Sequence, residues 1–270
     1  MTDLVRTVAD LRARLADATR PIGLVPTMGA LHDGHRSLIA AARAECATVV
    51  VSIFVNPSQF GRADDLARYP RDEEGDAASA RAAGADVLFV PEVEELYPAG
   101  FATWVDVEGL SEVLEGAARP EHFRGVATVC LKLFTVVAPQ RAYFGQKDAQ
   151  QAALVRRMIA DLALPMELRV MPTVRDHDGV ALSSRNAYLA RDERARAAVL
   201  PSALRAGLRA HRAGQDPIEA AREVLDAAPG IEIDYVDIGP WQPPTLVVAV
   251  RIGTTRLIDN VPLTSESVEP

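Results

Sequence analysis

Residues 21–55 read PIGLVPTMGALHDGHRSLIAAARAECATVVVSIFV, and the pattern of side chains changes repeatedly along this stretch. Residues 21–25 are a short apolar run and residues 47–55 are a second one, rich in β-branched side chains, so we expect both to be buried strands. Residues 35–45 between them have apolar side chains at helical spacing. A strand, a helix and a second strand in this order predict a parallel βαβ unit.

The same alternation continues on both sides of this unit. Residues 4–18 and 72–83 have helical spacing, and residues 86–90 read as a further buried strand. Beyond them the sequence indicates an apolar helix or strand, a strand, an amphipathic helix and a strand, at residues 126–138, 142–144, 149–163 and 166–171. Repeated alternation of this kind is typical of an α/β domain with a parallel sheet.

After about residue 190 the sequence changes character. We expect two helices rich in Ala and Arg, followed by three strands, at residues 191–213, 216–228, 231–238, 245–252 and 254–260, with a tight turn at Gly253. This pattern is typical of a small α+β module. We therefore predict an α/β domain over residues 1–175 and a smaller C-terminal α+β domain over residues 176–270.

The composition excludes several classes of protein. Of the 270 residues, 49% are apolar and 24% are charged, which is ordinary for a globular chain. The net charge of −8 disfavours general binding to nucleic acid or to anionic membranes, because such binding depends on a basic surface. The sequence has no apolar run of membrane-spanning length and no apolar segment of a secretory signal. Cys46 and Cys130 lie in apolar segments and form no CxxC pair, so we expect reduced cysteines and a cytoplasmic protein.

The sequence HDGH at residues 32–35 places two histidines where a predicted strand passes into a predicted helix. Ligands of open α/β sheets bind beyond the carboxyl ends of the strands, and a helix N-terminus offers free backbone N–H groups to a phosphate. Two imidazoles there could stabilise negative charge on phosphate oxygens in a transition state. Two alternatives stay open: a turn histidine followed by a helix-start histidine, and a metal site. The chain contains neither a Walker A loop nor a GxGxxG motif.

Two further segments carry hydrogen-bond donors suited to phosphates. GQKD at residues 145–148 follows a predicted strand and contains Lys147, one of only two lysines among 29 basic residues. LSSRN at residues 182–186 combines two hydroxyls with a guanidinium. Each segment is also compatible with simple helix capping, in which Asp148 or a serine begins a helix and the lysine is solvated.

The remaining candidates are amide side chains and one loop. NPSQF at residues 56–60 follows a predicted strand, and QQ at residues 150–151 offers two more amides. Neutral amides can recognise the hydroxyl and carboxylate groups of a small substrate. HFRG at residues 122–125 is a candidate mobile loop over a site. An ordinary loop or surface turn is the alternative for each segment.

HxGH at the first strand–helix junction resembles the signature of the nucleotidyltransferase superfamily, whose two histidines contact ATP phosphates. LSSRN resembles the second, phosphate-clamping element of that superfamily. Six motifs then match the pantothenate synthetase (pantoate–β-alanine ligase) family in order and spacing. They are PTMGALHDGH (26–35), FVNPSQF (54–60), YPR (69–71), EGAARPEHFRGV (115–126), YFGQKDAQQ (143–151) and DGVALSSRN (178–186). From these motifs the chain is identified as a member of that family.

The resemblance implies a Rossmann-like domain, a small C-terminal domain that closes over the nucleotide, and a homodimer. It also implies a reaction in two steps. The carboxylate of (R)-pantoate attacks the α-phosphate of ATP, giving pantoyl adenylate and pyrophosphate, and β-alanine then displaces AMP. ATP with Mg²⁺ and small-molecule substrates are therefore the expected ligands, and no nucleic acid or membrane is expected as a partner.

Carried over residue by residue, the resemblance implies an ATP site formed by Met28, Gly29, Ala30, Leu31, His32, Asp33, Gly34, His35, Gly145, Gln146, Lys147, Asp148, Val174, Leu182, Ser183, Ser184 and Arg185. His35 would be the proton donor of the family. We interpret both His32 and His35 as stabilisers of charge on the phosphates. Lys147 and Arg185 complete the expected catalytic set.

For the other substrates, the resemblance implies that Gln59 and Gln151 hold pantoate, with Gln59 also near β-alanine. Asn56, Tyr69 and His122 are further candidates for this part of the site. Asp148 is a candidate partner of Mg²⁺ through water, because Mg²⁺ keeps most of its own waters.

The sequence departs from the family pattern at Glu121, where the pattern usually has glycine. This departure bears on closure of the segment 115–126 and not on the chemistry. Two other functions compete with this one. One is another HxGH nucleotidyltransferase that adenylylates a phosphomonoester, which should need extra basic residues where residues 54–60 and 147–151 offer amides. The other is a non-catalytic nucleotide-binding module, against which the intact set of two histidines, Lys147 and Arg185 argues.

Overall fold

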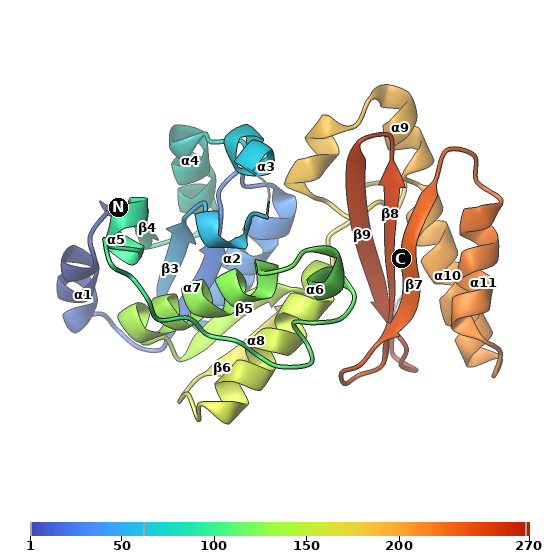
Figure 1. Cartoon of the computed structure of the whole chain (residues 1–270). Coiled ribbons are helices and arrows are strands. Elements are labelled where there is room, and N and C mark those ends of the chain that lie inside the picture. The colour runs from blue at the N-terminus through green and yellow to red at the C-terminus, as the bar shows by residue number, and fades with distance from the viewer. Residues whose placement is uncertain (1, 62, 268) are drawn as a thin grey trace. The chain divides into compact units, whose positions relative to one another are not determined.

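A six-stranded parallel sheet forms the centre of the N-terminal part of the chain (Figure 1). The computed structural model describes residues 2–61, 63–267 and 269–270. The strand order is β1-β4-β3-β2-β5-β6. The strands are β1 (Asp3–Val5), β2 (Ile22–Thr27), β3 (Thr48–Ile53), β4 (Val87–Phe89), β5 (Arg141–Gly145) and β6 (Glu167–Met171). The predicted α/β fold with a parallel sheet is confirmed.

The order of the strands reverses at β2, which pairs with β3 on one side and with β5 on the other. In open sheets of this kind, ligands bind beyond the carboxyl ends of the strands at the point of reversal. The loop that begins at Met28 follows β2, and Gln146 follows β5. The topology therefore predicts a ligand site beyond the carboxyl ends of β2 and β5.

Helices cover both faces of the sheet because successive strand residues alternate between two cores. Leu24 and Val50 pack in one core with residues of α1, α7 and α8. Val25 and Val51 pack in the other with residues of α2 and α4. The helices of this part are α1 (Val8–Ala16), α2 (Asp33–Glu45), α3 (Ala63–Arg68), α4 (Glu73–Ala83), α5 (Val93–Leu96), α6 (Glu115–Ala118), α7 (His122–Val137) and α8 (Ala149–Asp161), with 3-10 turns η1 (Pro57–Gln59) and η2 (Gln146–Asp148).

The first predicted helix, over residues 4–18, is wrong at its start. Residues 3–5 form the edge strand β1, which pairs with β4. The helix begins only at Val8, because Thr7 caps it: its Oγ1 accepts the backbone N–H of Asp10 at 3.0 Å. The segment left open as helix or strand at residues 126–138 is helical and belongs to α7.

A three-stranded antiparallel sheet, in the order β7-β8-β9, carries the C-terminal part. Its strands are β7 (Glu232–Gly239), β8 (Thr245–Ile252) and β9 (Thr255–Pro262), and its helices are α9 (Arg191–Arg196), α10 (Val199–Arg212) and α11 (Pro217–Asp226), with the 3-10 turn η3 (Ser184–Tyr188). The predicted single helix over residues 191–213 is interrupted. Pro201 explains the break, since proline is tolerated in the first turn of α10 but not inside a longer helix.

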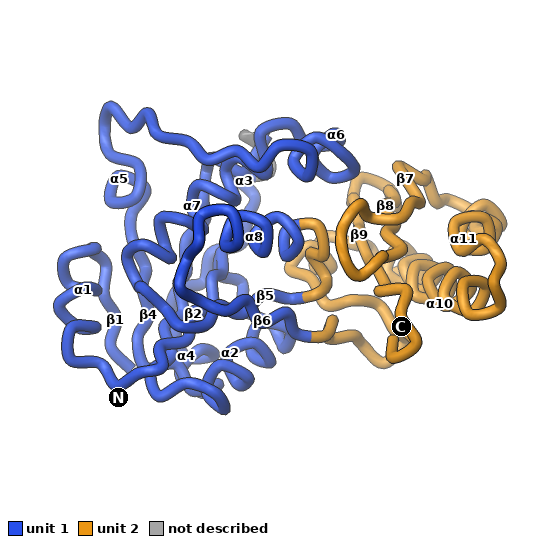
Figure 2. Tube along the Cα trace, turned by 90° about the horizontal axis from the view of Figure 1, so that it is seen from below, with its two compact units in different colours: residues 1–145, 151–171 blue, residues 146–150, 172–270 orange. Residues whose placement is uncertain are grey.

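The chain forms two compact units, shown in different colours in Figure 2. The first comprises residues 1–145 and 151–171, and the second comprises residues 146–150 and 172–270. The domain boundary between residues 175 and 176 stays a prediction. Among the described residues, no helix is both long enough and apolar enough to span a membrane.

Candidate active site

The two histidines of HDGH cap the helix that they precede. His32 is the N-cap of α2, and its Nδ1 accepts the backbone N–H of Gly34 at 3.1 Å. His35 reaches back, and its Nδ1 accepts the backbone N–H of His32 at 3.3 Å. The ring centroids lie 4.2 Å apart. Because Nδ1 of each ring is an acceptor, the proton of each neutral imidazole is on Nε2. Both rings therefore present the same tautomer, with Nε2–H as the donor.

Asp76, in the first turn of α4, holds the loop that leads to these histidines. Its carboxylate accepts the backbone N–H of Ala30 at 2.8 Å and that of Leu31 at 2.7 Å. Gly29 and Ala30 have φ angles of 84° and 52°, and successive N–H groups in such a turn form a concave anion site. A Cβ atom on Gly29 would lie 2.7 Å from Asp76 Oδ2, so the close approach requires glycine.

The expectation of free backbone N–H groups at this helix start needs correction. Protein side chains already accept the N–H groups of Ala30, Leu31, His32 and Gly34. Among the side chains of this segment, the imidazole Nε2–H groups are the candidate donors to a phosphate. The positive end of the α2 dipole adds to their effect. Asp33, also predicted for the ATP site, forms an ion pair with Arg36.

A chain of amides links the end of β3 to the loop after β2. Asn56 is 1% exposed, and its Nδ2 donates to Gln59 Oε1 at 3.1 Å and to the carbonyl oxygen of Gly125 at 3.1 Å. Gln59 Nε2 donates in turn to Met28 Sδ at 2.8 Å. The structure thus brings together three residues that the sequence predicted for the site. Thioether sulfur is a weak acceptor, so this last donor can be redirected to a better one.

The HFRG segment is not a mobile loop and not a surface turn. It forms the first turn of α7, and His122 is 9% exposed. A hydrogen bond of 2.8 Å joins His122 Nδ1 to the carbonyl oxygen of Gln59. A Cβ on Gly125 would meet the carbonyl oxygen of Ser58 at 2.5 Å, so glycine lets α7 pack directly on η1. His122 therefore lies beside the amide chain as part of the framework.

The departure from the family pattern at Glu121 falls on a special backbone conformation. Glu121 has φ 68° and ψ −13°, in the left-handed region where glycine is favoured.

Two further candidates for the substrate site lie in other elements. Tyr69 is 6% exposed and packs edge-on against Phe60, with ring centroids 5.7 Å apart. Gln151 lies in the first turn of α8.

In the second unit, residues 174–182 form a hairpin that leads to LSSRN. The N–H of Leu182 donates to the carbonyl oxygen of Val174 at 3.0 Å, and Arg175 pairs with Ala181. The hairpin turns at Asp178-Gly179, where Gly179 has a φ angle of 85°. These contacts fix the position of the backbone that continues into Ser183, Ser184 and Arg185.

The serines of LSSRN begin a 3-10 turn. Ser183 is the N-cap of η3, and its Oγ accepts the backbone N–H of Arg185 at 3.3 Å. Asn186 Nδ2 donates to the carbonyl oxygen of Ala181 at 3.0 Å, which ties the turn back to the hairpin. The capping interpretation thus describes Ser183 correctly. It does not account for Ser184 and the Arg185 side chain.

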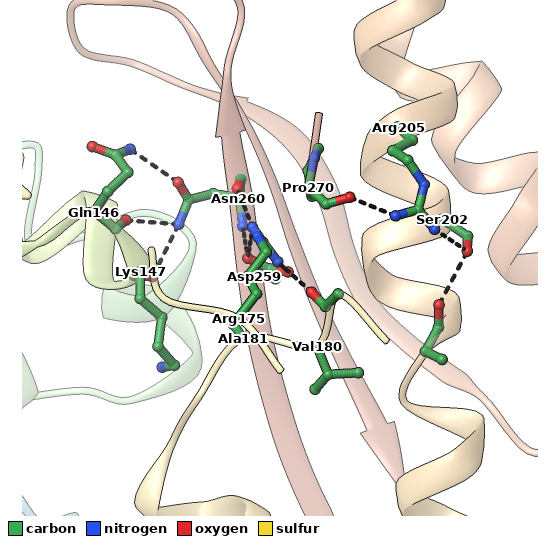
Figure 3. Close-up of polar contacts among 12 residues, drawn as sticks. Gln146, Lys147, Arg175, Val180, Ala181, Ser202, Arg205, Asp259, Asn260 and Pro270 are labelled. Atoms are coloured by element: carbon green, nitrogen blue, oxygen red, sulfur yellow. Dashed lines mark hydrogen bonds and ion pairs between the residues drawn. The ribbon is translucent and has the colours of Figure 1, made fainter. Parts of the chain in front are cut away.

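Lys147 lies in η2, which packs in the second unit against β9 (Figure 3). Its Nζ is 3.4 Å from Asp148 Oδ1. The side-chain amide of Asn260 donates to the carbonyl oxygens of Gln146 and Lys147, each at 2.9 Å. Gln146 Nε2 donates to Asn260 Oδ1 at 2.9 Å. Gly145, before this turn, is the last residue of β5.

The residues that the structure describes do not form a metal site of their own. Within the described part of the chain, no group of three or more His, Cys, Asp and Glu side chains could hold an ion. The Nδ1 atoms of His32 and His35 are engaged by backbone N–H groups, which weakens the metal interpretation of HDGH. A single carboxylate such as that of Asp148 suits the way Mg²⁺ is usually bound, by one or two carboxylates and substrate phosphates, with several waters kept.

The chain resembles known proteins over nearly its whole length. The family model described as Pantoate-beta-alanine ligase matches residues 3–262. The chain belongs to the pantoate-beta-alanine ligase family.

Curated members of the family match over nearly the whole chain. The pantothenate synthetase of Acidobacterium capsulatum is 52% identical over 257 residues, which cover 90% of this chain and 86% of that protein. The pantothenate synthetase of Chloroflexus aggregans is 51% identical over 273 residues, covering 95% of this chain and 98% of that protein.

Solved structures of the family have the same fold. Pantothenate synthetase from Thermus thermophilus superposes with a TM-score of 0.92 at 48% identity, covering 97% of this chain and 99% of that one. Pantoate-beta-alanine ligase from Francisella tularensis, complexed with beta-gamma ATP and beta-alanine, has a TM-score of 0.84 at 32% identity, covering 96% and 97%.

Sequence reasoning missed Asp76, Asp259 and Asn260, although each holds a segment that carries the family motifs. Asp76 resembled an ordinary acidic residue in the first turn of a helix, which is a common feature. The pair Asp259-Asn260 gave a usable signal, since two polar residues interrupt an otherwise apolar strand pattern, RLIDNVPL. Buried polar side chains need partners, and such a pair marks a structural or functional contact.

Proposed function

We propose that this chain condenses (R)-pantoate with β-alanine to form pantothenate, using ATP and releasing AMP and pyrophosphate. The supporting observation is the reciprocal capping of His32 and His35, in a chain of the pantoate-beta-alanine ligase family. It fixes both imidazoles with Nε2–H as donor at the carboxyl end of β2. Donors held in place before the reaction stabilise developing charge without the cost of reorganisation.

In the first step, a carboxylate oxygen of pantoate attacks the α-phosphorus of ATP, and the bond to the bridging oxygen of pyrophosphate breaks. The Nε2–H groups of His32 and His35 donate to phosphate oxygens as negative charge builds, and His35 is the candidate proton donor. Lys147 and Arg185 act as cations toward the triphosphate, with Ser183 and Ser184 as further donors. The remaining motif residues, from Met28 to His35, Gly145 to Asp148, Val174 and Leu182, line the nucleotide.

In the second step, the amine of β-alanine attacks the acyl carbon, and AMP leaves. AMP is a far better leaving group than the oxide that an unactivated carboxylate would have to release. We assign pantoate to the amides of Gln59 and Gln151, with Asn56, Tyr69 and His122 as further contacts. The Gln59 amide, now on Met28 Sδ, gains a stronger acceptor when a substrate hydroxyl or carboxylate binds.

Mg²⁺ accompanies ATP in this proposal and neutralises part of the phosphate charge. Asp148 is its candidate protein partner, through water. The family resemblance further implies a homodimer in the cytoplasm. Light scattering on the purified protein tests the dimer, which should have about twice the chain mass of 29.0 kDa.

The deciding experiment is exchange of labelled pyrophosphate into ATP, with and without pantoate and in the absence of β-alanine. Exchange that requires pantoate supports a reversible acyl-adenylate step. Exchange that requires a phosphomonoester instead would assign the chain to adenylyl transfer onto phosphates. ATP binding without exchange under any condition would contradict both enzymatic functions.

A further inference from the structure

Asn260 is a buried amide whose hydrogen bonds are directed at the segment that carries Lys147. It lies on β9 and is 4% exposed. Its Nδ2 donates to the carbonyl oxygens of Gln146 and Lys147, and its Oδ1 accepts from Gln146 Nε2, all at 2.9 Å (Figure 3). Both protons of the Asn260 amide are therefore used on two consecutive peptide groups of η2.

These bonds fix the position of the Lys147 backbone. A 3-10 turn of three residues has little stability of its own, and its carbonyl groups need partners. Asn260 supplies them across 113 residues of sequence. The lysine side chain is a flexible stem, so the position of its backbone limits where its ammonium can reach.

The preceding residue of the strand anchors the other candidate phosphate segment. Asp259, with its side chain 2% exposed, accepts from both Nη atoms of Arg175, at 2.6 Å and 3.0 Å. Arg175 Nη1 also donates to the carbonyl oxygen of Gly179 at 2.9 Å, which closes the hairpin leading to Ser183–Arg185. Two adjacent residues of β9 thus hold both segments within the second unit.

We propose that Asn260 is a positioning residue for Lys147. It fixes the backbone of η2, so that the ammonium of Lys147 is presented to the phosphates of ATP. Asp259, the preceding residue of the same strand, anchors the segment Ser183–Arg185 through Arg175. This inference rests on the proposed function, in which Lys147 acts on the triphosphate.

The test compares Asn260→Ala and Asn260→Asp with the unchanged protein. Asn260→Ala removes the three bonds, and Asn260→Asp keeps the shape but turns an oxygen toward two carbonyl oxygens. The matched control is Val261→Ala, the next residue of the same strand, which packs in the core of the second unit. By strand alternation its side chain lies on the face of β9 opposite to Asn260, so this control lowers stability and leaves the three bonds of Asn260 in place.

Pantoate-dependent pyrophosphate exchange should lose kcat/KM for ATP by about 10- to 100-fold in both Asn260 variants, the scale expected when a charged group is misplaced. The KM for pantoate should change little, and Val261→Ala should keep both constants. Hydrogen exchange measured by mass spectrometry should speed up in the peptide covering residues 146–150 in the Asn260 variants and not in the control. Unchanged kcat/KM for ATP in a folded Asn260→Asp protein would overturn the inference.

A double-mutant cycle separates positioning from a general loss of structure. If Asn260 acts through Lys147, Asn260→Ala should cost less than about twofold when it is added to Lys147→Ala. A full additional loss in that background would overturn this inference and leave the proposed function standing. No pantoate-dependent exchange in the unchanged protein would overturn the proposed function, and this inference with it.

Discussion

Asp76 Oδ2 accepts the backbone N–H of Ala30 at 2.8 Å, although the two residues lie 46 positions apart. The same carboxylate accepts the N–H of Leu31, and it lies in the first turn of α4, where the helix dipole favours a negative charge. The loop before His32 is thus held by one buried anion. Gly29 and Ala30 of this loop have left-handed φ angles, which turn successive backbone N–H groups to the same side. The Asp76 carboxylate accepts the N–H groups of Ala30 and Leu31 and so stabilises this conformation.

Asp76→Asn should lower the free energy of unfolding by about 1–3 kcal/mol, because the amide can accept only one of the two N–H groups and turns a donor toward the other. It should also slow pyrophosphate exchange, since the loop sets the histidines. Urea denaturation and the exchange assay measure the two effects. The control is Asp72→Asn at the exposed N-cap of the same helix, where asparagine caps as well as aspartate. Equal stability of the two variants would contradict the role of the loop contact.

His32→Asn should separate capping from chemistry. Asparagine keeps an N-cap acceptor for Gly34, so the free energy of unfolding should change by less than about 0.5 kcal/mol. The Nε2–H donor is lost, and pantoate-dependent exchange should fall by a factor on the order of 10². His35→Ala should reduce exchange to a similar degree. Exchange at the rate of the unchanged protein in either variant would remove that histidine from the proposed mechanism.

Glu121→Gly should stabilise the protein by about 1 kcal/mol, because a left-handed conformation costs a residue with a Cβ atom that much. The exposed ion pair of Glu121 with Arg124, at 3.2 Å, contributes little against this gain. Ala138→Gly is the matched variant at the other end of α7, where the C-cap has φ 47° and ψ 55°. Both variants should raise the midpoint of thermal unfolding. A lower midpoint for Glu121→Gly alone would show that its side chain has a further structural role.

The pKa of Asp176 predicts a loss of stability in acid. Its hydrogen bonds from His177, with that from Arg194, lower this pKa from 3.8 to about 2. A pKa that is lower in the folded state contributes stability above the unfolded value, and this contribution disappears as the pH falls from about 4 toward about 2. Arg194 also lowers the pKa of Asp178, so both carboxylates act in the same direction.

Urea denaturation of the unchanged protein and of Arg194→Gln measures this contribution. The difference in unfolding free energy should be present near neutral pH and should shrink below about pH 4, when the carboxylates that Arg194 holds become protonated. High salt should reduce the difference as well, because these groups are partly exposed. A difference that is constant with pH would assign the role of Arg194 to packing.

Much of the fold could be predicted because the signals are local. The apolar runs at 21–25 and 47–55 became β2 and β3, and the helical spacing between them became α2. The edge strand β1 escaped prediction since its three residues acquire strand structure only through pairing with β4, over 80 residues away. The break before α10 was foreseeable from Pro201, which the repeating Ala and Arg pattern obscured.

The candidate site likewise has parts with local sequence signals, which could be predicted, and parts that depend on distant contacts, which could not. Motif spacing located HDGH, GQKD and LSSRN, and the roles of their residues stay predictions. The bonds of Asp76 to Ala30 and of Asn260 to Lys147 join a side chain to a distant backbone group. No periodicity or spacing encodes such a bond, because the backbone partner can belong to any residue type. HFRG was misread for a related reason: its burial depends on contact with η1, from another part of the chain.

The chain passes between the two units three times, after Gly145, after Gln150 and after Met171, and only residues 146–150 belong to the second unit on the first passage. The C-terminal hundred residues are therefore not an interchangeable module. A chimaera that joins the first 171 residues of this protein to the tail of a relative would combine Lys147 from one parent with the strand that holds it from the other. We expect such a chimaera to keep the turn in place only where the two short sequences match, so the turn and the strand should be exchanged together despite their distance along the gene.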